Sequence, residues 1–260
     1  MSLGDSFKKL FSKKEADDWE CPELQYGFTV THHAGAMGQK PNTLEAIGYS
    51  IYHGAGCVEL DVSFRPDGTP VIIHSAEPGQ NQGELLDMAL KIIAGSRKCK
   101  INLDLKSVAN LSAVDDLIYN YNLEERAFYT GVGENWIEKV KAESKIPFYL
   151  NHAITKEEAE DLPTGKALVE RIKSMGAIGV NSPYTFCSEQ LCRMMHRRDL
   201  YVSIWTINSI DKTKALLECG VDNITSMKPD KLEKLIYGEE DEIANMSVIR
   251  DEYYDDDDED

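Results

Sequence analysis

Residues 31–75 read THHAGAMGQKPNTLEAIGYSIYHGAGCVELDVSFRPDGTPVIIHS. This stretch contains a helical run followed by an apolar strand and a tight turn. The predicted strand at residues 57–64 carries two carboxylates, Glu59 and Asp61, among apolar neighbours. Side chains of a strand alternate between its faces, so residues two apart point the same way. Both acids therefore lie on one face of a strand that is otherwise built for burial.

Histidines stand beside the same strand in the sequence. A predicted strand at residues 26–31 ends in His32 and His33, and the short apolar run at 71–73 after the turn delivers His74. We expect residues 71–73 to pair back on the preceding strand as a hairpin. Two histidines and two carboxylates at strand ends suit acid/base chemistry beside a hard cation.

The rest of the chain alternates short apolar runs with helical stretches. Eight strands alternating with eight helices favour an α/β fold, a single-domain TIM (β/α)8 barrel, over an open doubly wound sheet, which usually has fewer strands. Predicted strands are residues 26–31, 57–64, 100–105, 127–130, 147–151, 177–181, 201–206 and 222–225. Predicted helices are residues 42–53, 83–94, 111–121, 134–144, 156–174, 188–198, 211–219 and 229–237. The domain is expected to span residues 21–238.

Charge is concentrated at the end of the chain. The 260 residues carry a formal charge of −17, and residues 239–260 hold 12 acids and one base, which leaves about −6 for the remainder. Such a tail buries little apolar surface and is expected to be disordered. Nucleic acid is not expected as a partner, because binding it normally requires a basic surface.

The N-terminal extension predicted over residues 1–20 contains a basic cluster, Lys8, Lys9, Lys13 and Lys14. Four lysines and three apolar residues at helical spacing predict a short amphipathic helix or extension, either touching anionic lipid weakly or capping the domain. No secretory signal or membrane span is seen, so a cytoplasmic protein is expected. Six scattered cysteines without a C-x-x-C pair are interpreted as reduced thiols.

Active sites of TIM barrels lie at the C-terminal ends of the strands. Asp104 and Lys106 share one face of the strand at residues 100–105, and the leucines between them are expected to pack outward. Together with Glu59 and Asp61, Asp104 offers an oxygen-rich site for Mg²⁺ or Ca²⁺. Other polar or aromatic residues at strand ends are Thr130, Asn151, Asn181 and Trp205.

Several of these motifs resemble those of the glycerophosphodiester phosphodiesterases, relatives of the phosphatidylinositol phospholipases C. The matching positions, in order, are His32, Asn42-Thr43, Glu59-x-Asp61, Asp67-Gly68-x-Pro70-Val71, His74 and the late Trp205-Thr206-Ile207-Asn208. Departures are His33 for the family arginine, Pro41 for the usual glutamate, Ser75 for a common acid, and Asp104 for the usual glutamate. The family usually carries an insertion of several dozen residues after the second histidine, and this chain lacks it.

The resemblance implies metal-dependent hydrolysis of glycerophosphodiesters to glycerol phosphate and an alcohol. His32 and His74 are the predicted acid and base, and Glu59, Asp61 and Asp104 the predicted ligands of Mg²⁺ or Ca²⁺. Predicted substrate-binding residues are His33, Lys106, Asn181 and Trp205. The substrate is a small-molecule phosphodiester. Two alternatives are phospholipase C-like or sphingomyelinase D-like cleavage of lipid head groups, and a non-catalytic barrel that binds phosphodiesters.

Overall fold

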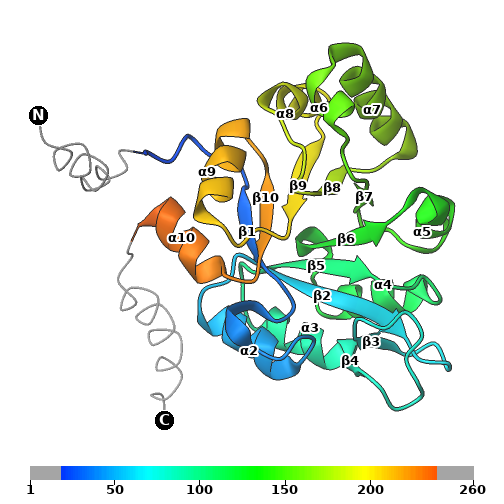
Figure 1. Cartoon of the computed structure of the whole chain (residues 1–260). Coiled ribbons are helices and arrows are strands. Elements are labelled where there is room, and N and C mark those ends of the chain that lie inside the picture. The colour runs from blue at the N-terminus through cyan, green and yellow to red at the C-terminus, as the bar shows by residue number, and fades with distance from the viewer. Residues whose placement is uncertain (1–18, 239–260) are drawn as a thin grey trace, which may run out of the picture.

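Eight parallel strands form a closed barrel in the computed structural model, which describes residues 19–238 (Figure 1). β1 pairs with β10 on one side and with β2 on the other, and these pairings close the barrel. The strands are β1 (Thr29–His32), β2 (Cys57–Phe64), β5 (Lys100–Leu105), β6 (Ala127–Val132), β7 (Phe148–Asn151), β8 (Gly179–Pro183), β9 (Tyr201–Trp205) and β10 (Asn223–Ser226). The predicted TIM barrel is therefore confirmed.

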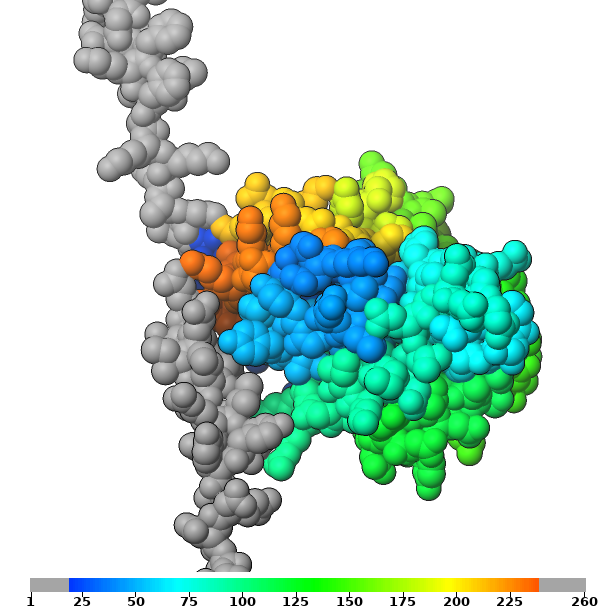
Figure 2. Space-filling view, turned by 90° about the horizontal axis from the view of Figure 1, so that it is seen from below, coloured from blue at the N-terminus to red at the C-terminus, as the bar shows by residue number. Residues whose placement is uncertain are grey.

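Helices follow each barrel strand and cover its outer face (Figure 1). They are α2 (Leu44–Tyr52), α3 (Leu86–Ala94), α4 (Leu111–Asn120), α5 (Ile137–Glu143), α6 (Lys156–Glu160), α7 (Leu162–Met175), α8 (Glu189–His196), α9 (Ile210–Cys219) and α10 (Pro229–Tyr237). Short 3₁₀ turns are η2 (Ala36–Gly38), η3 (Glu124–Arg126) and η4 (Glu134–Trp136). Figure 2 shows the first described segments, in blue, packed against the last, in orange, which agrees with the pairing of β1 and β10.

A small antiparallel hairpin extends the sheet beyond β2. β3 (Pro70–Ile72) pairs antiparallel with β2, and β4 (Glu84–Leu85) pairs with β3. The expected hairpin is confirmed, and the chain then enters α3 directly. The connection from β3 to β5 therefore contains the expected helix, which begins at Leu86 because residues 84–85 form a short strand that was not predicted.

The helix predicted at residues 156–174 is broken in two. Asp161 ends α6 and caps α7, because its carboxylate accepts a hydrogen bond from the backbone N–H of Thr164. Pro163 occupies the first turn of α7, where its missing N–H costs nothing. The proline and the capping aspartate together start a new helix where helical periodicity alone predicts one continuous element.

Apolar side chains pack between the strands and the helices, whereas several polar ones fill the barrel interior. Leu103 and Leu105 are buried under the helices, as expected from the alternation along β5. Inside the barrel, Asn223 of β10 accepts hydrogen bonds from Thr29 and Thr31 of β1 and donates one to Ser203 of β9. These buried polar side chains thus provide hydrogen-bond partners for one another.

No helix within residues 19–238 combines the length and apolar character that crossing a bilayer requires. The predicted basic N-terminal segment lies outside the described residues except for Trp19 and Glu20, and the acidic tail lies outside them entirely. Their proposed boundaries stay predictions.

Candidate active site

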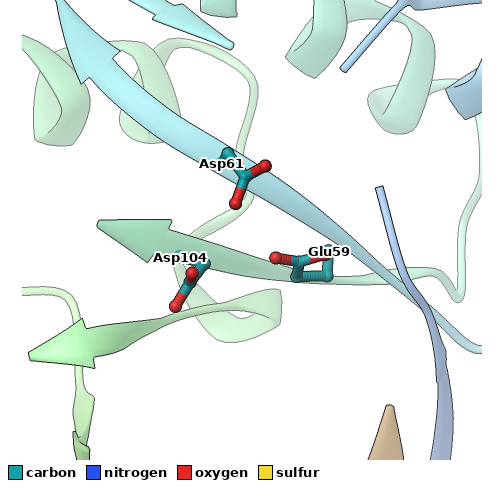
Figure 3. A group of neighbouring side chains, drawn as sticks. All are labelled: Glu59, Asp61 and Asp104. Carbon is teal, nitrogen blue, oxygen red and sulfur yellow. The ribbon is translucent and has the colours of Figure 1, made fainter. Parts of the chain in front are cut away.

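Three carboxylates meet inside the C-terminal half of the barrel (Figure 3). Glu59 and Asp61 project from β2, and Asp104 projects from β5, directly opposite Asp61 in the strand register. One oxygen of each carboxylate lies within 4.8 Å of the others. Glu59 and Asp61 are almost fully buried. The period-two pattern on two neighbouring strands is what brings the three acids together.

Backbone and side-chain donors hold each carboxylate in place. The N–H of Ala34 donates to Glu59 Oε2 at 2.9 Å. Asn42 donates to Asp61 Oδ2 at 2.6 Å and accepts from the N–H of Asp61 at 3.1 Å. Thr130 Oγ1 lies 2.7 Å from Asp104 Oδ1. Each acid thus keeps part of its lone-pair capacity for another partner.

Electrostatics at the cluster favour a further cation. Burial, together with the neighbouring carboxylates of Asp104 and Asp61, raises the pKa of Glu59 well above its usual range. Lys106 lies 2.9 Å from Asp61 and also contacts Asp104. Burial alone would lower the pKa of Lys106, but these two acids outweigh it and raise that pKa. One lysine offsets part of the charge of three acids.

The carboxylates line a cavity of about 270 Å³. The other residues that line it come from seven barrel strands and the segments that follow them. They are His33, His74, Asn102, Lys106, Thr130, Asn151, Asn181, Trp205, Thr206 and Thr225. Lys106, Asn181, Trp205 and His74 therefore lie where the sequence-based hypothesis requires them.

His33, and not His32, faces this cavity. His33 Nδ1 lies 3.6 Å from Glu59 Oε2, and burial lowers the pKa of this imidazole although Asp61 and Asp104 oppose the shift. His32 is buried on the other side of the backbone, where its Nε2 lies 3.0 Å from Glu233 of α10. Adjacent strand residues point to opposite faces, so the structure does not bring His32 to the acids as expected.

Three cavity residues are absent from the sequence-based list. Asn102 precedes Asp104 by two positions on β5, so the same alternation that selects Asp104 would have selected it. Thr225 stands on β10, and Thr206 directly follows β9. Their positions at strand ends are consistent with a place in the site, but threonine is too common at strand ends to identify a site residue from the sequence.

A hydrogen-bonded chain of amides forms the far wall of the cavity. Asn151 of β7 accepts from the N–H of Gly131 at 3.1 Å and from Asn181 of β8 at 2.8 Å. Asn181 in turn accepts from Ser203 of β9 at 2.9 Å. The wall thus presents amide and hydroxyl groups at fixed positions opposite the acids.

Comparison with known proteins identifies the same architecture. Residues 79–231 match the model of the glycerophosphoryl diester phosphodiesterase family. The Arabidopsis thaliana glycerophosphodiester phosphodiesterase GDPD4 is 22% identical over 250 residues, covering 84% of this chain and 76% of that protein. The Bacillus subtilis protein YqiK, which is uncharacterized, is 27% identical over 239 residues, covering 80% of this chain and 98% of YqiK.

Solved structures share the fold at low sequence identity. A glycerophosphoryl diester phosphodiesterase of Silicibacter pomeroyi, so assigned without proof of activity, superposes with a TM-score of 0.68 at 18% identity, covering 83% of this chain and 94% of its own. A phosphodiesterase of Oleispira antarctica, in complex with the product sn-glycerol-3-phosphate, gives a TM-score of 0.66 at 20% identity, covering 82% and 98%.

Proposed function

This chain belongs to the glycerophosphoryl diester phosphodiesterase family, and we propose that it hydrolyses glycerophosphodiesters to glycerol phosphate and an alcohol in the cavity described above, with a divalent cation and two histidines. The single observation that carries this proposal is that both histidines and all three acids converge there. His33 and His74 line the same 270 Å³ space as Glu59, Asp61 and Asp104.

Glu59, Asp61 and Asp104 would hold the cation. The fit rests on the donor set: three carboxylates, crowded within 4.8 Å and largely buried, form the oxygen-rich site that Mg²⁺ and Ca²⁺ prefer. The raised pKa of Glu59 agrees with this assignment, because it reflects burial and then the negative charge of Asp104 and Asp61, and a bound cation would offset both. When bound, such a cation supplies Lewis-acid polarisation of a phosphate oxygen.

His33 and His74 are the proposed acid/base pair, and His33 replaces the expected His32. Burial lowers the pKa of His33, so its imidazole is neutral near neutral pH and able to accept a proton from the attacking hydroxyl or water. His74 lies across the cavity and protonates the departing alkoxide in this scheme. The reaction consumes one water and releases one alcohol and one phosphomonoester.

Lys106 and the amide wall position the phosphodiester. The pKa of Lys106 is raised, so the residue stays an ammonium and offers charge to the phosphate. Asn181 and Trp205 line the opposite side of the cavity and contact the parts of the substrate that flank the phosphate. The Nδ1 atom of His33 lies 3.6 Å from Glu59 Oε2, so this carboxylate can orient the imidazole ring in the cavity.

A mutational comparison at the paired histidines tests the proposal. His33→Ala and His74→Ala should each lower kcat for glycerophosphodiester hydrolysis by about 100-fold or more, because each removes a general acid or base. His32→Gln, which keeps a donor toward Glu233, should retain kcat within a few-fold. His53→Ala, at an exposed position after α2, is the control. The proposal fails if His33→Ala retains full turnover in a protein that is correctly folded.

A further inference from the structure

Three exposed aromatic side chains follow the ends of neighbouring strands β8 and β9. Tyr184 and Phe186 lie on the loop after β8, and Trp205 ends β9; their exposed fractions are 42%, 36% and 37%. Figure 1 shows these two strands, drawn in yellow, side by side. Exposed large aromatic residues that gather at one place often mark a binding surface.

The aromatic rim is continuous with the cavity. Trp205 lines the cavity itself, and its strand partner is Pro183, the residue before Tyr184. The N–H of Tyr184 donates to the carbonyl of Trp205 at 3.2 Å. The backbone of Tyr184 therefore lies directly beside Trp205 at the edge of the cavity. We call Tyr184, Phe186 and Trp205 the rim.

The connection that carries an insertion in related enzymes leaves the rim open here. Between β3 and β5 the chain forms only β4 and α3. The inner face of α3 is buried against the barrel and its neighbours, with Leu86, Leu90 and Ile93 fully covered. This connection therefore packs as an ordinary barrel helix and adds no subdomain above the cavity.

A lysine already occupies one aromatic face of the rim. Lys212 Nζ, on α9, lies 3.7 Å from the centre of the Tyr184 ring. A cation placed over an aromatic face is attracted to it, and this is how proteins commonly bind quaternary ammonium groups. Lys212 takes that position on Tyr184 and repels a second positive charge. The rim is thus poorly suited to a cationic alcohol such as choline.

We propose that the rim is the subsite for the alcohol portion of the substrate, and that this alcohol is neutral and apolar. This inference rests on the proposed function. The acids, Lys106 and the amide wall provide polar contacts for the phosphate and glycerol inside the cavity, while Tyr184 and Phe186 remove an alkyl chain from water outside it.

Three soluble substrates test the chemistry of the alcohol. They are the glycerophosphodiesters of methanol, octanol and choline, with the octyl ester kept below its micelle concentration. Each methylene removed from water contributes about fourfold, so partial cover of the chain predicts kcat/KM at least about tenfold higher for the octyl than for the methyl ester. The choline ester should be no better than the methyl ester.

Variants of the rim assign the effect to its residues. Tyr184→Ser and Phe186→Ser should each lower the octyl-to-methyl ratio of kcat/KM by about threefold or more, mainly through KM. Lys212→Gln should raise the choline-to-methyl ratio, because it frees the face of Tyr184. The matched control is Tyr119→Ser, which removes an aromatic residue that is 70% exposed on α4, away from the cavity.

Failure of this inference can be distinguished from failure of the proposed function. Equal kcat/KM for the methyl and octyl esters in the wild-type protein overturns the rim subsite while hydrolysis itself stands. An octyl preference that Tyr184→Ser and Phe186→Ser leave unchanged also overturns it, because the chain then binds elsewhere. Absence of hydrolysis of all three esters with Mg²⁺ or Ca²⁺ present overturns the proposed function and the subsite with it.

Discussion

The ionised carboxylate of Glu59 lowers the stability of the folded protein, although the proposed metal site requires this residue. Its carboxylate is almost fully buried beside two others, and its pKa is raised, first by burial. A raised carboxylate pKa means that the folded state binds this proton more tightly than the unfolded chain does. The ionised form therefore lowers stability, and this cost grows as the pH rises through the range between the unfolded and the folded pKa. Near neutral pH the proposed cation would offset it.

Glu59→Gln should separate these two effects. Without added cation, the neutral amide should raise Tm by a few degrees, corresponding to about 1 kcal/mol for a domain of this size. With Mg²⁺ or Ca²⁺, the wild-type Tm should rise through binding to the folded state, and the variant should lose most of that rise. Thermal unfolding with cation and with excess chelator measures both quantities.

Glu138→Gln is the matched control, because Glu138 is highly exposed on α5. It should leave both Tm values almost unchanged. A cation-induced rise in Tm that is as large in Glu59→Gln as in the wild-type protein would contradict the assignment of Glu59 as a ligand.

At the residue scale, the sequence predicts the face of the sheet on which a side chain lies only when the residue is inside a strand. Glu59, Asp61 and Asp104 lie on long apolar strands, where the alternation defines inside and outside and the three acids converge as expected. His32 and His33 stand at a strand end, and a shift of one residue exchanges which of them faces inward. The contact of His32 with Glu233, about 200 residues away, decides between them and leaves no local signal.

At the scale of elements, a bulge in β6 shapes the site. The register between β6 and β7 shifts between Tyr129 and Val132, and Gly131 adopts a positive φ of 75° there. The regular register between β5 and β6 places Thr130 beside Asp104. The irregularity toward β7 lies where the N–H of Gly131 donates to Asn151. Bulges often redirect side chains next to active sites. The sequence-based strand stops at residue 130 because it does not anticipate this irregularity.

Gly131→Ala should damage both stability and turnover. A Cβ on Gly131 would lie 2.4 Å from the carbonyl oxygen of Leu105, and the positive φ adds strain of about 1–2 kcal/mol. Since the obstacle is the β5 backbone, β5 and β6 must separate, which moves Asp104. We expect a loss of more than 2 kcal/mol in the free energy of unfolding and a fall in kcat of tenfold or more.

Gly176→Ala provides the comparison for this prediction. Gly176 has φ of 77°, but a Cβ there meets no atom within 4 Å. It should cost only the backbone strain and leave kcat unchanged, as measured by chemical denaturation and steady-state kinetics. Equal losses of stability in the two variants would show that the close approach of β5 and β6 at Gly131 does not add to the cost of a Cβ at that position.

Other element boundaries follow from local chemistry to different degrees. The bounds of β2, β5 and α10 match the expected ranges, because a turn, a run of apolar residues or a proline marks their limits. The division between α6 and α7 depends on Asp161 and Pro163, which periodicity ignores. Capping residues therefore indicate helix boundaries that the spacing of hydrophobic residues does not predict.

At the scale of the whole molecule, the barrel gathers residues from His33 to Thr225 around one cavity. The eight alternations of strand and helix predict the closed barrel and place the site at the C-terminal strand ends. They do not predict the rim, because the exposure of Tyr184 and Phe186 depends on how neighbouring loops pack. The fold and the acids are thus accessible from the sequence, whereas the contacts between distant loops are not.

The most direct test of the central claim is identification of the products that the purified full chain forms from a glycerophosphodiester, by phosphorus and proton NMR. With Mg²⁺ or Ca²⁺ we predict glycerol phosphate and free alcohol in equal amounts, with formation abolished by excess chelator and restored by adding the cation back. Full turnover in excess chelator would contradict the metal site at Glu59, Asp61 and Asp104. Release of glycerol with a phosphorylated alcohol, or no turnover with either cation, would contradict the proposed reaction.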